Sequence, residues 1–270
     1  MSIKNEDVKY LVFDVESVPD AKLIKKVKYP EEDIDEQSAV RKFQEEIQKG
    51  SNGATDFIPV TFQYPITICI AKVGEDFSLA DIVSLDQPAF RTSEMVRLFW
   101  HGVENIYSHS TLVTFNGRGF DIPILELMAF RYGYSIKKHF KDKAAGRNRY
   151  SPKHIDLQDH LSNYNAIRIA GGLNLLAKVL GKPGKMSAKG DMVYEMFLGG
   201  DIQKINDYCI HDVLDTYFVF LRTRVLQGDI GTAREQEIVQ KAKFFIYNNM
   251  ERIPALKEYF DNWDDWGAWP

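Results

Sequence analysis

An apolar segment that ends in two acids constrains the fold of this chain more than any other feature. Residues 10–13 read Tyr-Leu-Val-Phe, which is typical of a buried β-strand, and Asp14 and Glu16 follow two residues apart. Residues i and i+2 of a strand point to the same side, so both carboxylates project together. Two crowded like charges resist burial, and a divalent cation removes that cost. Oxygen ligands suit Mg²⁺ or Mn²⁺, although acid pairs at strand ends are also common without a metal.

The pattern along the chain predicts an α/β fold, with a mixed sheet flanked by helices and a helical C-terminal part. Strand-like segments are expected at 9–15, 66–74, 78–86, 111–116 and near 155, the second and third forming a hairpin on the edge of the first. Helices are expected at 93–105 with a Ser93 cap, at 120–133 with an end at Gly133, and at 171–181, 191–200, 201–226 and 232–250. Strands early, helices late and a helix between strands favour this class.

Two segments stand apart from the expected sheet. Residues 17–64 form a charged insertion, and Val40, Phe43 and Ile47 recur within it at the spacing of one amphipathic helix. Residues 226–270 comprise a helix and a Trp-rich tail. We expect the tail to pack on the body, and a peptide that docks on a partner protein is the alternative.

Charge and cysteine content narrow the function classes. The net charge of -4 excludes a broadly basic nucleic-acid binder, so a polyanionic partner needs a local basic surface or metal ions. Cys69 and Cys209 are too few for a disulfide framework and fit a reducing compartment. The N-terminus lacks the apolar region of a signal peptide, and there is no apolar run of about 18 residues. We therefore expect a cytoplasmic protein without membrane contact.

Two later segments also place acids at element boundaries or on helix faces. In residues 111–121 an apolar strand runs through a Gly-rich turn to Asp121, at the start of a helix, where the simplest role is an N-cap. In the helix at 201–226, Tyr208 and Asp212 are four residues apart and share a face, with Asp215 close to it. Taken alone, this pattern is more typical of a tyrosine packed over a helix turn with solvated acids.

Taken together, the three segments resemble a known superfamily. "VFDVES", "TFNGRGFDIPIL" and "YCIHDVLDTYFVFLR" resemble, in order, the three motifs of the DEDD exonucleases. The match is to the Tyr variant of family-B DNA polymerase proofreading domains, and especially to stand-alone predicted 3′-5′ exonucleases related to them. The His variant carries a histidine five residues before the last aspartate, where this chain has Asp207, so His211 is interpreted as structural.

The resemblance spans residue 10 to about residue 224 and implies an RNase H-like fold with metal-dependent 3′-5′ exonuclease activity. Residues 1–225 would then be the exonuclease domain. Carried over by position, four acids would hold two Mg²⁺ or Mn²⁺ ions, namely Asp14, Glu16, Asp121 and Asp212. Tyr208 would orient the attacking water, because a phenol with a pKa near 10 is a poor base at neutral pH.

Substrate contacts are expected from the same resemblance and from nearby basic residues. Ser17 and Asn116 would touch the terminal nucleotides of a single-stranded DNA 3′ end, and Phe120 would stack on a base or else pack in the core. Arg118 and the loop residue Lys185 are expected near the phosphates; Lys182, Lys189, Arg147 and Arg149 are further basic candidates. Asp156, after a short strand, is expected either to support the metal ligands or to cap a local turn.

Two other functions remain open. The first is a catalytically silent nucleic-acid-binding or polymerase-associated module of the same fold, and retention of all four acids and the tyrosine disfavours it. The second is hydrolysis of another phosphoester, either RNA trimming or cleavage of a small substrate. Nothing in the three motifs reads a 2′-hydroxyl, so DNA and RNA are not distinguished.

Overall fold

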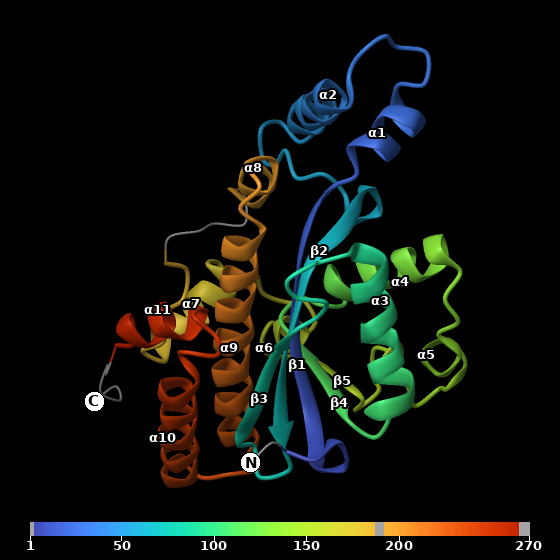
Figure 1. Ribbon diagram of the computed structural model, residues 1–270. Coiled ribbons are helices and arrows are strands. Elements are labelled where there is room, and N and C mark those ends of the chain that lie inside the picture. Colours follow the sequence, from blue (N-terminus) through green and yellow to red (C-terminus); the bar gives the residue numbers. More distant parts are fainter. Residues whose placement is uncertain (1–2, 187–191, 265–270) are drawn as a thin grey trace.

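A five-stranded sheet forms the centre of the molecule (Figure 1), which is described by a computed structural model for residues 3–186 and 192–264. The strands, in chain order, are β1 (Val8–Pro19), β2 (Gln63–Gly74), β3 (Leu79–Ser84), β4 (Thr111–Thr114) and β5 (His154–Asp156). Their order across the sheet is β3-β2-β1-β4-β5. β2 is antiparallel to β1 and β3, whereas β4 is parallel to β1 and β5. The predicted hairpin is confirmed, and this mixed topology is that of the RNase H-like fold.

Alternation along β1 assigns its side chains to two separate cores. Val12 packs on one face of the sheet, whereas Leu11, Phe13 and Val15 pack on the other. Asp14 is in phase with Val12. Its carboxylate therefore belongs to the face that the long C-terminal helix covers.

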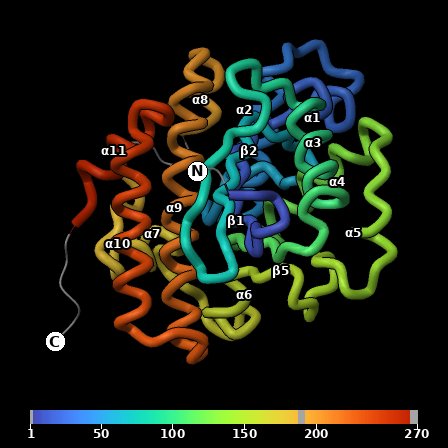
Figure 2. The backbone as a smooth tube through the Cα atoms, turned by 60° about the horizontal axis from the view of Figure 1, so that its bottom comes forward, coloured from blue at the N-terminus to red at the C-terminus, as the bar shows by residue number. Residues whose placement is uncertain are grey.

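Helices cover both faces of the sheet (Figure 2). One layer holds α3 (Thr92–His101), the π-helical turn η3 (Gly102–Ile106), α4 (Asp121–Tyr132) and α5 (Lys137–Lys141). The opposite layer holds α6 (Leu157–Leu161), α7 (Gly172–Val179), α8 (Val193–Leu198), α9 (Ile202–Gln227), α10 (Thr232–Asn249) and α11 (Ala255–Asp261). Short 3-10 turns, η1 (Asn5–Asp7) and η2 (Val60–Phe62), precede β1 and β2.

α9 is the central helix of its layer, because the sheet lies on one side of it and α7, α10 and α11 on the others. Buried residues therefore surround it, from Ile205 to Arg224, rather than forming one stripe. The helix ends at Gly228, whose left-handed φ of 83° suits a C-cap glycine. A buried helix of this kind holds the side chains on it in fixed positions against β1.

The charged insertion folds as two helices rather than the single one predicted. α1 (Ala21–Lys28) and α2 (Glu36–Gly50) pack on each other beyond the ends of β1 and β2, as Figure 1 shows. Their small core includes Ile24, Val40 and Phe43. α2 confirms the predicted helix, whereas α1 was missed because four lysines occupy its eight positions and obscure its short apolar face.

Three other predictions concern the end of α4, the start of α3 and the C-terminal tail. α4 ends at Gly133, as predicted, with a φ of 70°. The Ser93 cap is wrong, because α3 already begins at Thr92 and its N-cap residue, Arg91, makes no side-chain cap. α11 was not predicted, and it lies under Trp263, whose ring contacts Phe218 at a centroid distance of 5.0 Å. The rest of the Trp-rich tail, residues 265–270, lies outside the described residues.

Within residues 3–186 and 192–264, no helix is both long enough and apolar enough to cross a bilayer.

Candidate active site

β1 and α9 together form a cluster of carboxylates. Asp14 and Glu16 come from β1, and Asp212 lies on α9, two helical turns after Ile205. One carboxylate oxygen of each residue lies within 4.8 Å of the others, a spacing that one metal ion can bridge. All three side chains are partly buried. The structure thus brings together three of the four acids that the sequence predicted as ligands.

The fourth acid, Asp121, adjoins this cluster from α4. It is the first residue of that helix, and the N-cap position belongs to Phe120, so Asp121 is not the cap that its spacing alone would favour. Its side chain is only 2% exposed. Oδ1 of Asp121 is buried without a hydrogen-bond partner among the described residues. An unpaired buried carboxylate oxygen is costly, which is the pattern expected of a ligand position.

Burial raises the pKa of all four acids, and the charge of a neighbouring acid raises it further for Asp14, Glu16 and Asp121. The pKa of Asp14 rises to about 7, through loss of solvation first and the charge of Asp212 second. Burial raises the pKa of Asp212 to about 6. The pKa values of Glu16 and Asp121 lie well above their usual range for the same reasons. The cluster is therefore electrostatically incomplete unless positive charge joins it.

Tyr208 is attached to this cluster through Asp212. Its hydroxyl donates a hydrogen bond to the Asp212 carboxylate, and its ring packs against Val18 and Ile205. Burial, followed by the charges of the nearby acids, raises the pKa of Tyr208 strongly. The phenol therefore stays protonated and acts as a donor at any physiological pH.

Two cysteines lie directly behind the acids, and sequence reasoning did not connect them with the site. The Cys209 thiol lies 3.4 Å from the Asp14 carbonyl oxygen and 3.6 Å from its Oδ2. Cys69 is the β2 residue opposite Asp14 in the strand register, and its sulfur lies 3.4 Å from Asn206 Oδ1. Both thiols are free and buried. The predicted hairpin contained the signal for Cys69, because pairing β1 with β2 places it across from Asp14.

The residues present fit divalent cations. Carboxylate oxygens are hard donors that suit Mg²⁺ or Mn²⁺, and the cluster combines crowding with the unpaired Oδ1 of Asp121. Lys185 is the cation whose charge lowers the pKa of both Asp14 and Asp212. Its side chain is exposed, and its backbone N–H donates to Asn174 Oδ1. The predicted loop lysine therefore lies within electrostatic reach of the acids.

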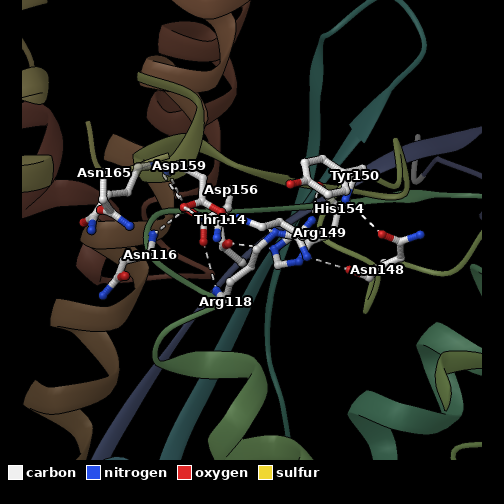
Figure 3. A network of polar contacts seen from close by, with 12 residues as sticks. Thr114, Asn116, Arg118, Asn148, Arg149, Tyr150, His154, Asp156, Asp159 and Asn165 are labelled. Carbon is white, nitrogen blue, oxygen red and sulfur yellow. Dashed lines mark hydrogen bonds and ion pairs between the residues drawn. The ribbon is translucent and has the colours of Figure 1, made fainter. Parts of the chain in front are cut away.

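The turn before Asp121 is held by Asp156 (Figure 3). The backbone N–H groups of Asn116 and Arg118 each donate to the Asp156 carboxylate at 2.9 Å. The same carboxylate caps α6 by accepting from the backbone N–H groups of Gln158 and Asp159. Asn116 has a left-handed φ of 63°, and these contacts hold it there. Asp156 therefore combines a local cap with support of the turn that leads to Asp121.

The basic residues beside this turn bind to the protein itself. Arg118 donates to the carbonyl oxygens of Gly146 and His154, at 2.9 and 2.8 Å. Arg149 pairs with Asp159 at 2.9 Å, as Figure 3 shows, and Arg147 pairs with Glu126 at 3.0 Å. These guanidinium groups are largely committed to holding loops together.

The remaining predicted contact residues are divided between the site and the scaffold. The Ser17 hydroxyl donates to the side chain of Gln63, next to Glu16 along β1. The ring of Phe120 is partly exposed and lies 6.1 Å from that of Phe57. Lys182 is buried, with its ammonium 4.3 Å from the centroid of the Trp263 ring. Lys189 lies outside the described residues.

Two other titratable residues of α9 serve packing. His211 Nε2 lies 2.8 Å from the Ala255 carbonyl oxygen, which agrees with its structural interpretation. The Tyr259 hydroxyl donates to Asp215 at 2.7 Å, and Asp215 is 1% exposed. Asp215 is therefore satisfied within the protein, one turn along α9 from Asp212.

The sheet order, the buried helix across one face and the acids within the first strand, which continues past them to Pro19, define the class as an RNase H-like nuclease. The chain belongs to the family of predicted 3′-5′ exonucleases related to the exonuclease domain of PolB, whose model matches residues 55–263. The match includes Asp121, Tyr208 and Asp212 but starts after Asp14 and Glu16. The geometry brings those two acids to the same cluster. Among curated proteins, none matches this sequence.

Proposed function

We propose that this protein is a metal-dependent 3′-5′ exonuclease that removes nucleotides from single-stranded DNA ends. The observation that carries the proposal is the convergence of Asp14, Glu16 and Asp212 on one cluster, with the unpaired oxygen of Asp121 beside it. Two Mg²⁺ or Mn²⁺ ions bound there would activate a water molecule and stabilise the leaving 3′ oxygen.

Each acid has a role that follows from its position. Asp14, Glu16, Asp121 and Asp212 are the proposed metal ligands. The charge of Asp14 raises the pKa of both Glu16 and Asp121, and that of Asp212 raises the pKa of Asp14. Because Asp14 is central among the acids, it would contribute to holding either ion.

Tyr208 is proposed to orient the water molecule that attacks the phosphate. Its hydrogen bond to Asp212 fixes the hydroxyl at the edge of the cluster. Because its pKa is raised, the phenol keeps its proton and cannot act as the base. Orientation by hydrogen bonding is what remains for it.

Substrate contacts are proposed for residues around the cluster. Ser17 and Asn116 would meet the terminal nucleotides, Phe120 a base, and Lys185 a phosphate. Arg118 would act mainly through the turn that it holds. Stacking on Phe120 favours a single strand, whose bases are already free. RNA remains the alternative substrate of the same chemistry, and the two free cysteines support the proposed cytoplasmic location.

Labelled oligonucleotides test this function. With Mn²⁺, a 5′-labelled single strand should shorten as a ladder, and a 3′-labelled one should release a labelled mononucleotide at once. EDTA or Asp14→Asn should stop both reactions. RNA and duplex substrates of matched sequence rank the alternatives. Release of a 5′-terminal mononucleotide, or binding without cleavage in Mn²⁺, would contradict the proposal and favour the silent module.

A further inference from the structure

We propose that Phe57, from the loop after α2, forms with Phe120 a stacking surface for the 3′-terminal base of the substrate. This inference rests on the proposed function and deepens it, because it names the part of the substrate that the insertion recognises. It gives the two-helix insertion a role in binding single-stranded nucleic acid.

The exposure of Phe57 is unusual for its surroundings. Its side chain is 53% exposed, whereas the adjacent Ile58 is 3% exposed and belongs to the core of the insertion. The backbone N–H of Phe57 donates to Thr55 Oγ1 at 3.0 Å, which shapes the loop locally. A buried neighbour and an ordered turn hold the aromatic ring outward, where an apolar ring loses free energy unless it contacts something.

A chain of hydrogen bonds ties this loop to the strand that carries the acids. The Ser17 hydroxyl donates to Gln63 Oε1, and Gln63 Nε2 donates to the carbonyl oxygen of Ile58. Gln63 is 4% exposed, so water competes little for these bonds. These bonds therefore connect Ile58, the residue after Phe57, through Gln63 to Ser17, which follows Glu16 on β1.

The second ring stands beside the cluster. Phe120 immediately precedes Asp121, and its centroid lies 6.1 Å from that of Phe57 with the ring planes inclined at 45°. Phe57 is 53% exposed and Phe120 is partly exposed, so both rings keep surface that a third ring can contact. A base that stacks there would end close to the carboxylates that act on its phosphate.

A nucleobase is the ligand that this surface fits best. Every base has a π-face, so stacking on phenylalanine tolerates sequence, as removal of successive nucleotides requires. One stacked base is worth about 1–3 kcal/mol, so loss of the Phe57 ring should weaken binding of a strand roughly 10-fold.

Fluorescence of 2-aminopurine at the 3′ terminus of a single strand tests the contact without turnover. In EDTA and again in Ca²⁺, the wild-type protein should quench this base on binding. Phe57→Ala should lose most of the quenching and raise Kd about 10-fold, whereas Phe57→Trp should restore both. Phe57→Leu keeps an apolar side chain without a π-face and should behave like Phe57→Ala. Phe244→Ala, a change at a 69% exposed phenylalanine of α10, is the matched control and should match wild type.

A strand with an abasic 3′-terminal residue completes the test. Wild type and Phe57→Ala should bind it equally, because the base is already absent. Equal weakening on abasic and normal strands, or normal quenching by Phe57→Leu, would overturn the stacking role. Stacking without cleavage in Mn²⁺ would sink the exonuclease proposal and keep this inference. Normal cleavage in Mn²⁺, together with wild-type quenching and Kd in Phe57→Ala, would overturn this inference and keep the exonuclease proposal.

Discussion

Two groups of residues, one around Asp156 and one around Asp14, lie near the points where parallel pairing in the sheet ends, and their carboxylates have opposite kinds of partner. Asp156 is in the last pair of β4 and β5, and its carboxylate accepts four backbone N–H bonds. Asp14 follows the last parallel pair of β1 and β4, and it meets other acids instead. The first group, the Asp156 network, is a scaffold. The second group, the acid cluster, is the proposed metal site.

The same contrast recurs within α9. Asp215 receives the Tyr259 hydroxyl in a closed core, whereas Asp212 shares its surroundings with Asp14 and Glu16. A fold tolerates a buried acid when donors reach it, and it keeps an unsatisfied one at a cost in stability. The difference between the two groups therefore predicts which substitutions impair catalysis and which impair folding.

The largest effect is expected from the acid cluster. Asp14→Asn or Asp212→Asn should remove detectable nuclease activity, because each deletes a proposed metal ligand. In EDTA neither variant should lose more than about 1 kcal/mol of unfolding free energy, since each also relieves repulsion. Nuclease assays and urea denaturation check the two halves. A large loss of stability in either variant would show that the cluster is part of the scaffold.

Asp156→Asn should show the reverse pattern. The neutral side chain loses charge-assisted bonds to the turn and to α6, so the free energy of unfolding should fall by about 2–4 kcal/mol. Activity at a temperature where the variant is folded should stay within roughly tenfold of wild type, since the ligands remain. Asp33→Asn, a change at an exposed acid, is the control and should change neither quantity. Complete loss of activity in folded Asp156→Asn would place it among the catalytic residues.

Tyr208→Phe separates positioning from metal binding. Loss of the hydroxyl should lower the cleavage rate about 100-fold, the effect of removing one oriented hydrogen-bond donor. The Kd for Mn²⁺, measured by calorimetry, should stay near that of wild type, because all four acids remain. The result that counts against this role is an unchanged rate, or a rate that falls only in step with Mn²⁺ affinity.

The two groups should also give stability opposite dependences on pH. Burial lowers the pKa of His154, in the Asp156 network, to about 3, so the unfolded chain binds the extra proton and stability falls as pH drops from about 6.5 toward 3. Asp14 has a raised pKa, so the folded state binds the extra proton and metal-free stability falls as pH rises from about 4 to 7.

Urea denaturation between pH 4 and 8 in EDTA measures both slopes. In His154→Gln, the free energy of unfolding should fall less toward acidic pH than in wild type. In Asp14→Asn, it should fall less toward neutral pH. Mn²⁺ should reduce the fall toward neutral pH in wild type. The two pKa shifts fix the sign with which the free energy of unfolding changes with pH. The remaining pH dependence should therefore have opposite signs in His154→Gln and Asp14→Asn. The same sign in both variants would show that His154 or Asp14 titrates in another way.

The sequence predicted the parts of the fold whose pattern is local. The β1 acids, the hairpin, the Gly133 end of α4 and the long α9 helix each follow from spacing and turn residues. α1 was missed because its lysines conceal a short apolar face, and Ser93 was mistaken for a cap one residue too late. Tertiary features have no such pattern. They arise only when distant segments meet, as do the contact of Cys209 with Asp14, the hydrogen bonds of Arg118 to backbone carbonyl oxygens, and the contact of Phe57 with Phe120.

The central claim is that the acid cluster exists to bind cations, and anomalous diffraction from crystals soaked in Mn²⁺ tests it most directly. The account predicts two manganese peaks within bonding distance of Asp14, Glu16, Asp121 and Asp212, and their loss in Asp14→Asn crystals. Manganese bound elsewhere, with the four carboxylates left without a metal ion, would contradict it.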